Sequence, residues 1–208
     1  MKIIGITNRL LCKNDFFEQI ELICKQNIYA LILREKDLDN KNYERLFIDC
    51  RKICRKYNIP LFVNSKIDVA IKLNCKNIQI SFKDFLDNKD KLNLFDNIGI
   101  SVHSLNEATV VEDWKIGRLE DWKKRRIEKN IFLIVGHIFE TDCKKGLNPR
   151  GTEFLKNICD SVNLQIFAIG GITEQTINQL KNIKMEGICV MSSLMKKNPK
   201  YFLEHVLF

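Results

Sequence analysis

The feature that most constrains the fold is an alternation of short apolar runs with longer amphipathic stretches along the whole 208-residue chain. Eight runs are rich in β-branched residues and nearly continuous in apolar side chains, as expected for parallel strands that are buried on both faces. Helical patterns lie between most of them. The predicted strands are residues 3–7, 30–34, 61–64, 77–81, 97–102, 131–136, 165–170 and 187–191.

Strands that alternate with helices predict a parallel sheet. Because a series of eight such units most naturally closes on itself, we predict an α/β fold, a single-domain (β/α)8 TIM barrel over residues 1–208. An open, doubly wound sheet is the alternative. No G-x-G-x-x-G motif follows the first predicted strand, which disfavours dinucleotide binding.

The crossover at residues 104–130 is longer than the other connections. Its sequence EDWK at 112–115 recurs at 120–123, and the pattern predicts a helix with an extra turn or two. The basic run at 123–126 is the best candidate for a nucleic-acid patch in a chain of net charge +8. Acidic residues are interleaved with it, however, so we predict a solvated helix face and no nucleic-acid partner.

The composition also bears on location. No apolar run approaches the roughly 18–20 residues of a membrane helix, and Asn8 and Arg9 interrupt the N-terminal apolar stretch, which therefore does not resemble a signal peptide. Several of the eight cysteines occupy apolar positions of helical patterns, where a thiol behaves as a small hydrophobe. We expect reduced thiols and a cytoplasmic protein with no membrane partner.

A barrel of this kind gathers its active site at the C-terminal ends of the strands. Gly170-Gly171 and Ser192-Ser193 follow the last two predicted strands, which is where such barrels hold a phosphate. Glycine allows close approach of the backbone, and we expect Thr173 to cap a helix over 173–181 whose free N–H groups face the anion.

Two histidines lie at other strand ends. His137 directly follows the predicted strand 131–136 and precedes a polar loop. An imidazole at a barrel mouth beside cations can stay neutral near pH 7, which suits a proton shuttle, although a packed and inert histidine is equally compatible with the spacing. His103 either has a structural role or orients a ligand.

Six segments occur in order and at barrel spacing: LREK (33–36), VN (63–64), ISVHSLNEA (100–108), GHIFETDCKKGLNPRG (136–151), AIGGI (168–172) and VMSSL (190–194). Together they resemble the thiamin phosphate synthase superfamily, which implies the same barrel fold. One branch of that superfamily joins hydroxymethylpyrimidine pyrophosphate to thiazole phosphate with magnesium. The other branch isomerises a carboxythiazole phosphate to its aromatic tautomer without metal.

Departures from the synthase pattern favour the thiazole tautomerase branch. Ile32 stands where the synthase has a glutamine that holds the pyrimidine, and Ser65 stands where it has the aspartate that binds magnesium. A neutral hydroxyl is a poor ligand for a hard dication. Gly136-His137 replaces the usual Gly-Pro of the synthase and matches the position of the tautomerase base.

The resemblance therefore implies an isomerase of thiamin biosynthesis with His137 as the catalytic base, no cofactor and no metal. Gly170, Gly171, Ser192 and Ser193 would bind phosphate. Arg34 would add positive charge, although a structural pair with Glu35 is an alternative. The expected substrate-binding residues are Arg34, Lys36, Asn64, Ser101, His103, Thr141, Cys143 and Lys144.

Two other functions stay open from the sequence. The first is thiamin phosphate synthase activity with magnesium, in which Asp84 would be a metal ligand. The second is a non-catalytic regulator that binds a thiamin precursor. The expected partner is a small phosphorylated thiazole, and a homodimer stays an open alternative.

Overall fold

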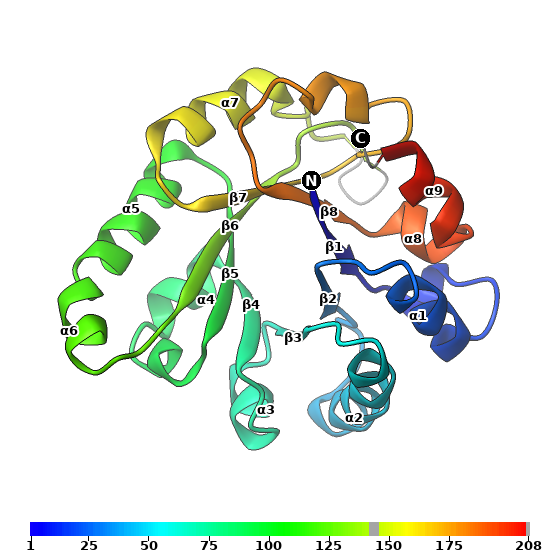
Figure 1. Ribbon diagram of the computed structural model, residues 1–208, viewed down its shortest axis with the longest axis horizontal. Coiled ribbons are helices and arrows are strands. Elements are labelled where there is room, and N and C mark those ends of the chain that lie inside the picture. The colour runs from blue at the N-terminus through cyan, green and yellow to red at the C-terminus, as the bar shows by residue number, and fades with distance from the viewer. Residues whose placement is uncertain (142–145, 207–208) are drawn as a thin grey trace.

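A computed structural model describes residues 1–141 and 146–206. Its eight parallel strands pair with their neighbours in chain order, and β8 pairs with β1, which closes the sheet into a barrel (Figure 1). The predicted (β/α)8 barrel is therefore confirmed. The strands are β1 (Lys2–Ile6), β2 (Ala30–Leu33), β3 (Leu61–Asn64), β4 (Asn77–Ser81), β5 (Asn97–Val102), β6 (Asn130–Gly136), β7 (Gln165–Ile169) and β8 (Gly187–Val190).

The helices lie around the outside of the strands (Figure 1). Aspartates begin the first two: Asp15 Oδ1 accepts from the N–H groups of Phe17 and Glu18, and Asp39 Oδ1 accepts from that of Asn42. The α-helices are α1 (Phe16–Cys24), α2 (Asn40–Lys56), α3 (Ile67–Lys72), α4 (Phe82–Asp87), α5 (Leu105–Ile116), α6 (Leu119–Lys124), α7 (Gly151–Ser161), α8 (Ser192–Lys196) and α9 (Pro199–Val206), and the 3-10 helices are η1 (Arg9–Leu11), η2 (Lys91–Leu94) and η4 (Ile177–Leu180).

The apolar core has two parts, one between the strands and the helices and one inside the barrel. Three aromatic rings fill much of the interior: Phe132 packs edge-on against Phe62 at 5.8 Å and against Phe167 at 5.2 Å between ring centroids. Gly99 is the register partner of Phe132, and a Cβ there would lie 2.6 Å from Phe132 Cζ. The interior therefore accommodates Phe132 because its neighbour has no side chain.

The crossover at 104–130 contains two helices, so the prediction of one extended helix is wrong. Helix α5 ends at Ile116 with Gly117 as its C-cap, and α6 begins after Arg118. Each copy of the EDWK repeat contributes one buried tryptophan, and the rings of Trp114 and Trp122 meet edge-on at 5.8 Å. The repeat therefore has a packing role: its two tryptophans join α6 to α5 through an aromatic contact.

The prediction of a helix over 173–181 is also wrong. Turns follow Gly171, and the only helical part of this stretch is η4. Thr173 does not cap a helix, because its hydroxyl accepts from Gln175 N and its backbone N–H donates to Thr176 Oγ1. Side-chain hydrogen bonds of this kind favour a turn over a helix.

Three of the cysteines predicted at apolar helix positions are buried in the described part of the chain. The thiols of Cys12, Cys24, Cys50, Cys54, Cys75, Cys159 and Cys189 are unpaired, and Cys24, Cys50 and Cys54 are buried. Cys143 lies outside the described residues. Within the described ranges, the structure contains no helix that is both long and apolar enough to cross a membrane.

The Trp114–Trp122 contact makes a prediction about stability. Replacing Trp122 by Ala should lower the free energy of unfolding by about 3 kcal/mol, since it removes a buried ring and leaves a cavity beside Trp114. Urea unfolding measures this, with Trp122→Phe as a partial rescue and Ile116→Ala, at a side chain 56% exposed, as the control. Equal stability of the two alanine variants would contradict the packing role.

Candidate active site

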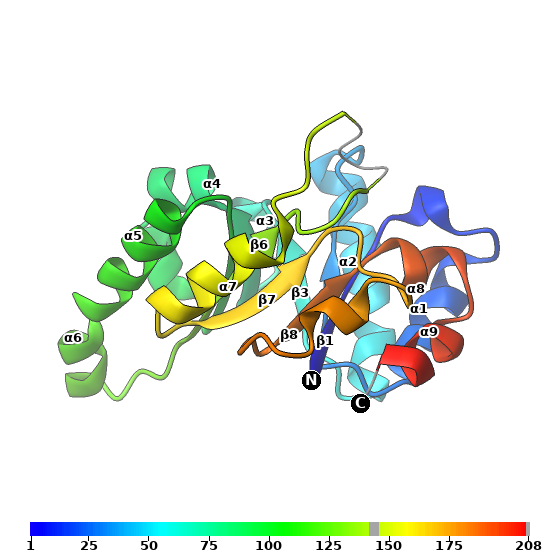
Figure 2. The same cartoon turned by 90° about the horizontal axis from the view of Figure 1, so that it is seen from above.

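A cavity of about 310 Å³ opens at the C-terminal ends of the strands. The segment that follows β6 extends on the opposite side of the barrel from the two chain ends (Figure 2). Apolar side chains from the barrel interior line the cavity: Ile6, Ile134, Ile169 and Cys189. Burial raises the pKa of the Cys189 thiol, so this floor is uncharged at neutral pH.

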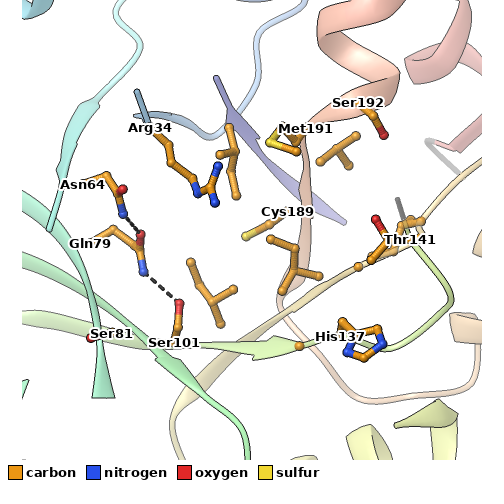
Figure 3. Close-up of a pocket in the computed structure, with 18 of the residues that line it drawn as sticks. Arg34, Asn64, Gln79, Ser81, Ser101, His137, Thr141, Cys189, Met191 and Ser192 are labelled. Carbon is orange, nitrogen blue, oxygen red and sulfur yellow. Dashed lines mark hydrogen bonds between the residues drawn. The ribbon is translucent and has the colours of Figure 1, made fainter. Parts of the chain in front are cut away.

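A row of neutral polar side chains forms one wall of the cavity (Figure 3). Asn64 Nδ2 donates to Gln79 Oε1 at 2.6 Å, and Gln79 Nε2 donates to Ser101 Oγ at 2.8 Å. The three residues come from β3, β4 and β5, so the row crosses neighbouring strands. Asn64 and Ser101 were predicted site residues, and the structure brings them together through Gln79.

Arg34 and Lys36 supply positive charge to the cavity, as expected. The suggested Arg34–Glu35 pair is wrong, because the buried Glu35 faces the β1–η1 connection. Glu35 Oε1 accepts from Thr7 Oγ1 at 2.6 Å, and both carboxylate oxygens accept from the N–H of Arg9. The Arg9 guanidinium also contacts Glu35. Arg34 is thereby left to point into the cavity (Figure 3).

His137 lines the cavity just beyond β6 and is only 6% exposed. Its Nε2 lies 3.3 Å from the carbonyl oxygen of Leu147. A carbonyl oxygen can only accept, so this contact places the proton of the neutral imidazole on Nε2 and leaves the lone pair on Nδ1. The hydrogen bond at Nε2 therefore fixes the tautomer of the ring, and Nδ1 is the nitrogen that can act as a base.

Backbone hydrogen bonds hold the segment around His137 on both sides. Ile138 N donates to Ile169 O at 3.0 Å and Phe139 N donates to Gly170 O at 2.9 Å. From the far end of the loop, Arg150 N donates to His137 O and Gly151 N donates to Ile138 O, both at 3.0 Å. The position of His137 is therefore set by β7 and by the start of α7.

Gly170 and Gly171 have positive φ angles of 108° and 64°, a region that side chains disfavour. A Cβ on Gly170 would lie 2.7 Å from His137 Cβ, and one on Gly171 would lie 2.2 Å from Glu140 O. The sequence predicted that a ligand approaches the backbone of these glycines closely. In the structure, residues 137–140 make at least part of that close approach. Both glycines also line the cavity as expected.

The two serines at the start of α8 are placed differently. Ser192 lines the cavity, whereas Ser193 is buried and does not belong to the lining residues. The first N–H groups of a helix have no partner within it. Within the described part of the chain, the N–H groups of Gly171, Ile172, Ser192 and Ser193 donate to no acceptor outside α8. These donors suit an anion at the cavity edge.

The remaining predicted residues divide into three groups. His103 and Thr141 line the cavity, and the His103 imidazole lies 3.7 Å from a Glu107 oxygen. Cys143 and Lys144 lie outside the described residues. Asp84 is not among the cavity residues, because it belongs to the capping box of α4, where its N–H donates to Ser81 Oγ at 3.1 Å.

Sequence reasoning missed Gln79 and Ser81 as site residues, although both line the cavity. A signal was present: in the strand NIQIS, polar residues alternate with Ile78 and Ile80. The two isoleucines pack in the outer core, so the polar positions face the barrel interior. A polar residue at an inward position of a buried strand indicates a site wall.

The side chains present do not fit a magnesium site. Ser65 offers a hydroxyl where a carboxylate would be needed, and the Asn64 amide is engaged with Gln79. None of the described cavity-lining residues is an aspartate or a glutamate. Within residues 1–141 and 146–206, no group of three or more His, Cys, Asp or Glu side chains is placed to hold a metal ion. Carboxylates are the ligands magnesium prefers.

The sequence comparisons with known proteins agree on one family. The family profile described as thiamine monophosphate synthase matches residues 3–194. A thiamine-phosphate synthase from Clostridium tetani is 33% identical over 172 residues, covering 79% of this chain and 73% of that protein. One from Clostridium acetobutylicum is 30% identical over 204 residues, covering 93% and 87%. The solved structure of thiamine phosphate pyrophosphorylase from Pyrococcus furiosus shares the fold, with a TM-score of 0.77, 23% identity and coverage of 99% and 93%.

The contact between Gly170 and His137 predicts a local effect of substitution. Gly170→Ala should cost about 1–3 kcal/mol of stability, because a side chain is strained at this φ and collides with His137. It should also shift the His137 Cε1–Hε1 signal in a ¹H–¹³C correlation spectrum. Gly117→Ala, at a φ of −60°, is the control. An unshifted His137 signal in Gly170→Ala would contradict the contact.

Proposed function

The chain belongs to the thiamine monophosphate synthase family of thiamin biosynthesis, and we propose that within it the protein is a thiazole tautomerase. The observation that carries the proposal is His137, a histidine of fixed tautomer that lines a cavity with an apolar floor and a neutral polar wall. Such a site offers a general base and positioning groups, which is what an isomerisation by proton transfer requires.

The proposed substrate is a carboxythiazole phosphate with an exocyclic double bond. His137 Nδ1 removes the proton from the ring carbon that bears the carboxylate, and the electron pair moves through the ring to the exocyclic carbon. The imidazolium then returns the proton to that carbon, which gives the aromatic thiazole and restores neutral His137. One proton leaves and one returns, so the reaction needs neither oxidant nor water. Aromatisation provides the driving force.

Both ends of this substrate have a counterpart in the cavity. The N–H groups and hydroxyl at Gly170, Gly171 and Ser192 are proposed to bind the phosphate. Arg34 and Lys36 lie at the cavity as well, and they would raise the local concentration of a substrate that carries two anionic groups. Ser193 is buried and does not line the cavity, so its proposed role is to help hold the start of α8 in place.

The names of the relatives favour a second candidate, thiamin phosphate synthase activity. That reaction joins hydroxymethylpyrimidine pyrophosphate to thiazole phosphate and uses magnesium. Two side chains argue against it in this chain: Ile32 is fully buried in the barrel interior, so no polar group replaces the expected glutamine, and Ser65 cannot supply the carboxylate.

Loss of the base should abolish most of the activity. His137→Ala is expected to lower kcat for the tautomerisation by about 10²- to 10⁴-fold, the usual contribution of a positioned general base. The absorbance of the aromatic product measures turnover, and circular dichroism checks the fold. His205→Ala, at an exposed histidine on α9, is the matched control. Turnover within a few-fold of wild type in His137→Ala would disprove the assignment.

The two candidate activities separate in a direct assay. The pure protein is offered either the carboxythiazole phosphate tautomer alone or hydroxymethylpyrimidine pyrophosphate with thiazole phosphate, each with magnesium and with EDTA. We expect aromatic thiazole from the first mixture in both conditions, because no metal takes part. Product from the second mixture alone, and only with magnesium, would replace the tautomerase by the synthase.

A further inference from the structure

We propose that Gln79 is a positioning residue that fixes the direction of the hydrogen-bonded row Asn64–Gln79–Ser101, so that the wall offers a hydroxyl donor at Ser101 to an acceptor on the substrate. The inference rests on the proposed function, for which this acceptor is the ring carboxylate. It assigns a role to a residue at which no ligand contact was expected from the sequence.

The direction of the row follows from one backbone group. Gln79 makes a third hydrogen bond, in which its side-chain nitrogen donates to the carbonyl oxygen of Ile80 at 2.9 Å. A carbonyl oxygen cannot donate, so the atom beside it must be Nε2 and the other end of the amide must be Oε1. The Gln79 amide therefore has a single orientation. With 6% exposure, it also has little water to substitute for these partners.

The orientation of the Gln79 amide determines which groups of Asn64 and Ser101 donate and which accept. Gln79 Oε1 can only accept, so Asn64 turns Nδ2 toward it and Oδ1 away from it (Figure 3). Gln79 Nε2 can only donate, so Ser101 Oγ accepts and its own proton must point elsewhere. None of the described residues accepts that proton, and Ser101 lines the cavity. The hydroxyl is thus oriented as a donor into the cavity.

The placement of charge indicates which ligand group this donor meets. Arg34 lies on the same side of the cavity as the row, whereas Ser192 lies on the opposite side (Figure 3). If Ser192 and the glycines take the phosphate, the second anionic group of the substrate faces Arg34 and Ser101. A hydroxyl already fixed as a donor binds a carboxylate without first reorienting, which is the benefit of a preorganised site.

The test is a double-mutant cycle with Gln79→Met and Ser101→Ala. Gln79→Met keeps the length of the side chain but removes the amide that orients Ser101. We expect each single variant to raise KM, and the Kd of the aromatic product in calorimetry, by about tenfold, with kcat within about threefold. In the Ser101→Ala background, Gln79→Met should change Kd less than about twofold, because its effect passes through Ser101.

Gln165→Met is the matched control, since Gln165 also lies in a strand but at the other end of the barrel. A kcat that falls as much as KM rises, or a full tenfold loss in the Ser101→Ala background, would overturn the positioning role. If the wild-type protein neither binds nor isomerises the thiazole, the proposed function fails instead.

A measurement on the free wild-type protein tests the row without any ligand. Both side-chain amide protons of Gln79 are hydrogen-bonded, so they should exchange with solvent more than tenfold more slowly than those of the exposed Gln175. Ser101→Ala should speed the exchange of one of the two. Exchange of the Gln79 protons at the rate of Gln175 would overturn the proposal even if the variants do not fold.

Discussion

The structure depends above all on the filling of the barrel interior. Eight strands close only if side chains occupy the space they enclose, and here Phe62, Phe132 and Phe167 do so, with Gly99 leaving room for the ring opposite it. Closure brings the C-terminal ends of all the strands to one rim. The same interior cluster includes Ile6, Ile134, Ile169 and Cys189, so the packing that fills the barrel also makes the floor of the site apolar.

The barrel could be predicted from the sequence because parallel strands buried on both faces are nearly continuous apolar runs, and all eight were visible. The rim residues Arg34, Asn64, Ser101 and His137 followed from their positions at strand ends. The Thr173 helix failed because local side-chain hydrogen bonds competed with it. The partners of Glu35 are set by packing of β2 against the β1–η1 connection, which no local pattern encodes. Gln79 lies inside a strand rather than at its end, which is why attention to strand ends missed it.

Family membership and site chemistry answer different questions in this protein. Residues 3–194 match the family as a whole. What a member does at that rim depends on a few side chains. With Ser65, with His137 after β6 and with no aspartate or glutamate among the described cavity residues, the cavity suits the proposed proton transfer better than a bound dication. Small changes at fixed positions can thus redirect the chemistry without altering the scaffold.

The two ends of the loop after β6 are joined to each other by the hydrogen bonds from Arg150 to His137 and from Gly151 to Ile138. These bonds bring the described start and end of this segment together at one point of the barrel rim. A change of sequence between these ends reaches the imidazole chiefly through Leu147, whose carbonyl oxygen lies 3.3 Å from Nε2. Substitutions that spare this contact leave the backbone on either side of His137 where β7 and the start of α7 hold it.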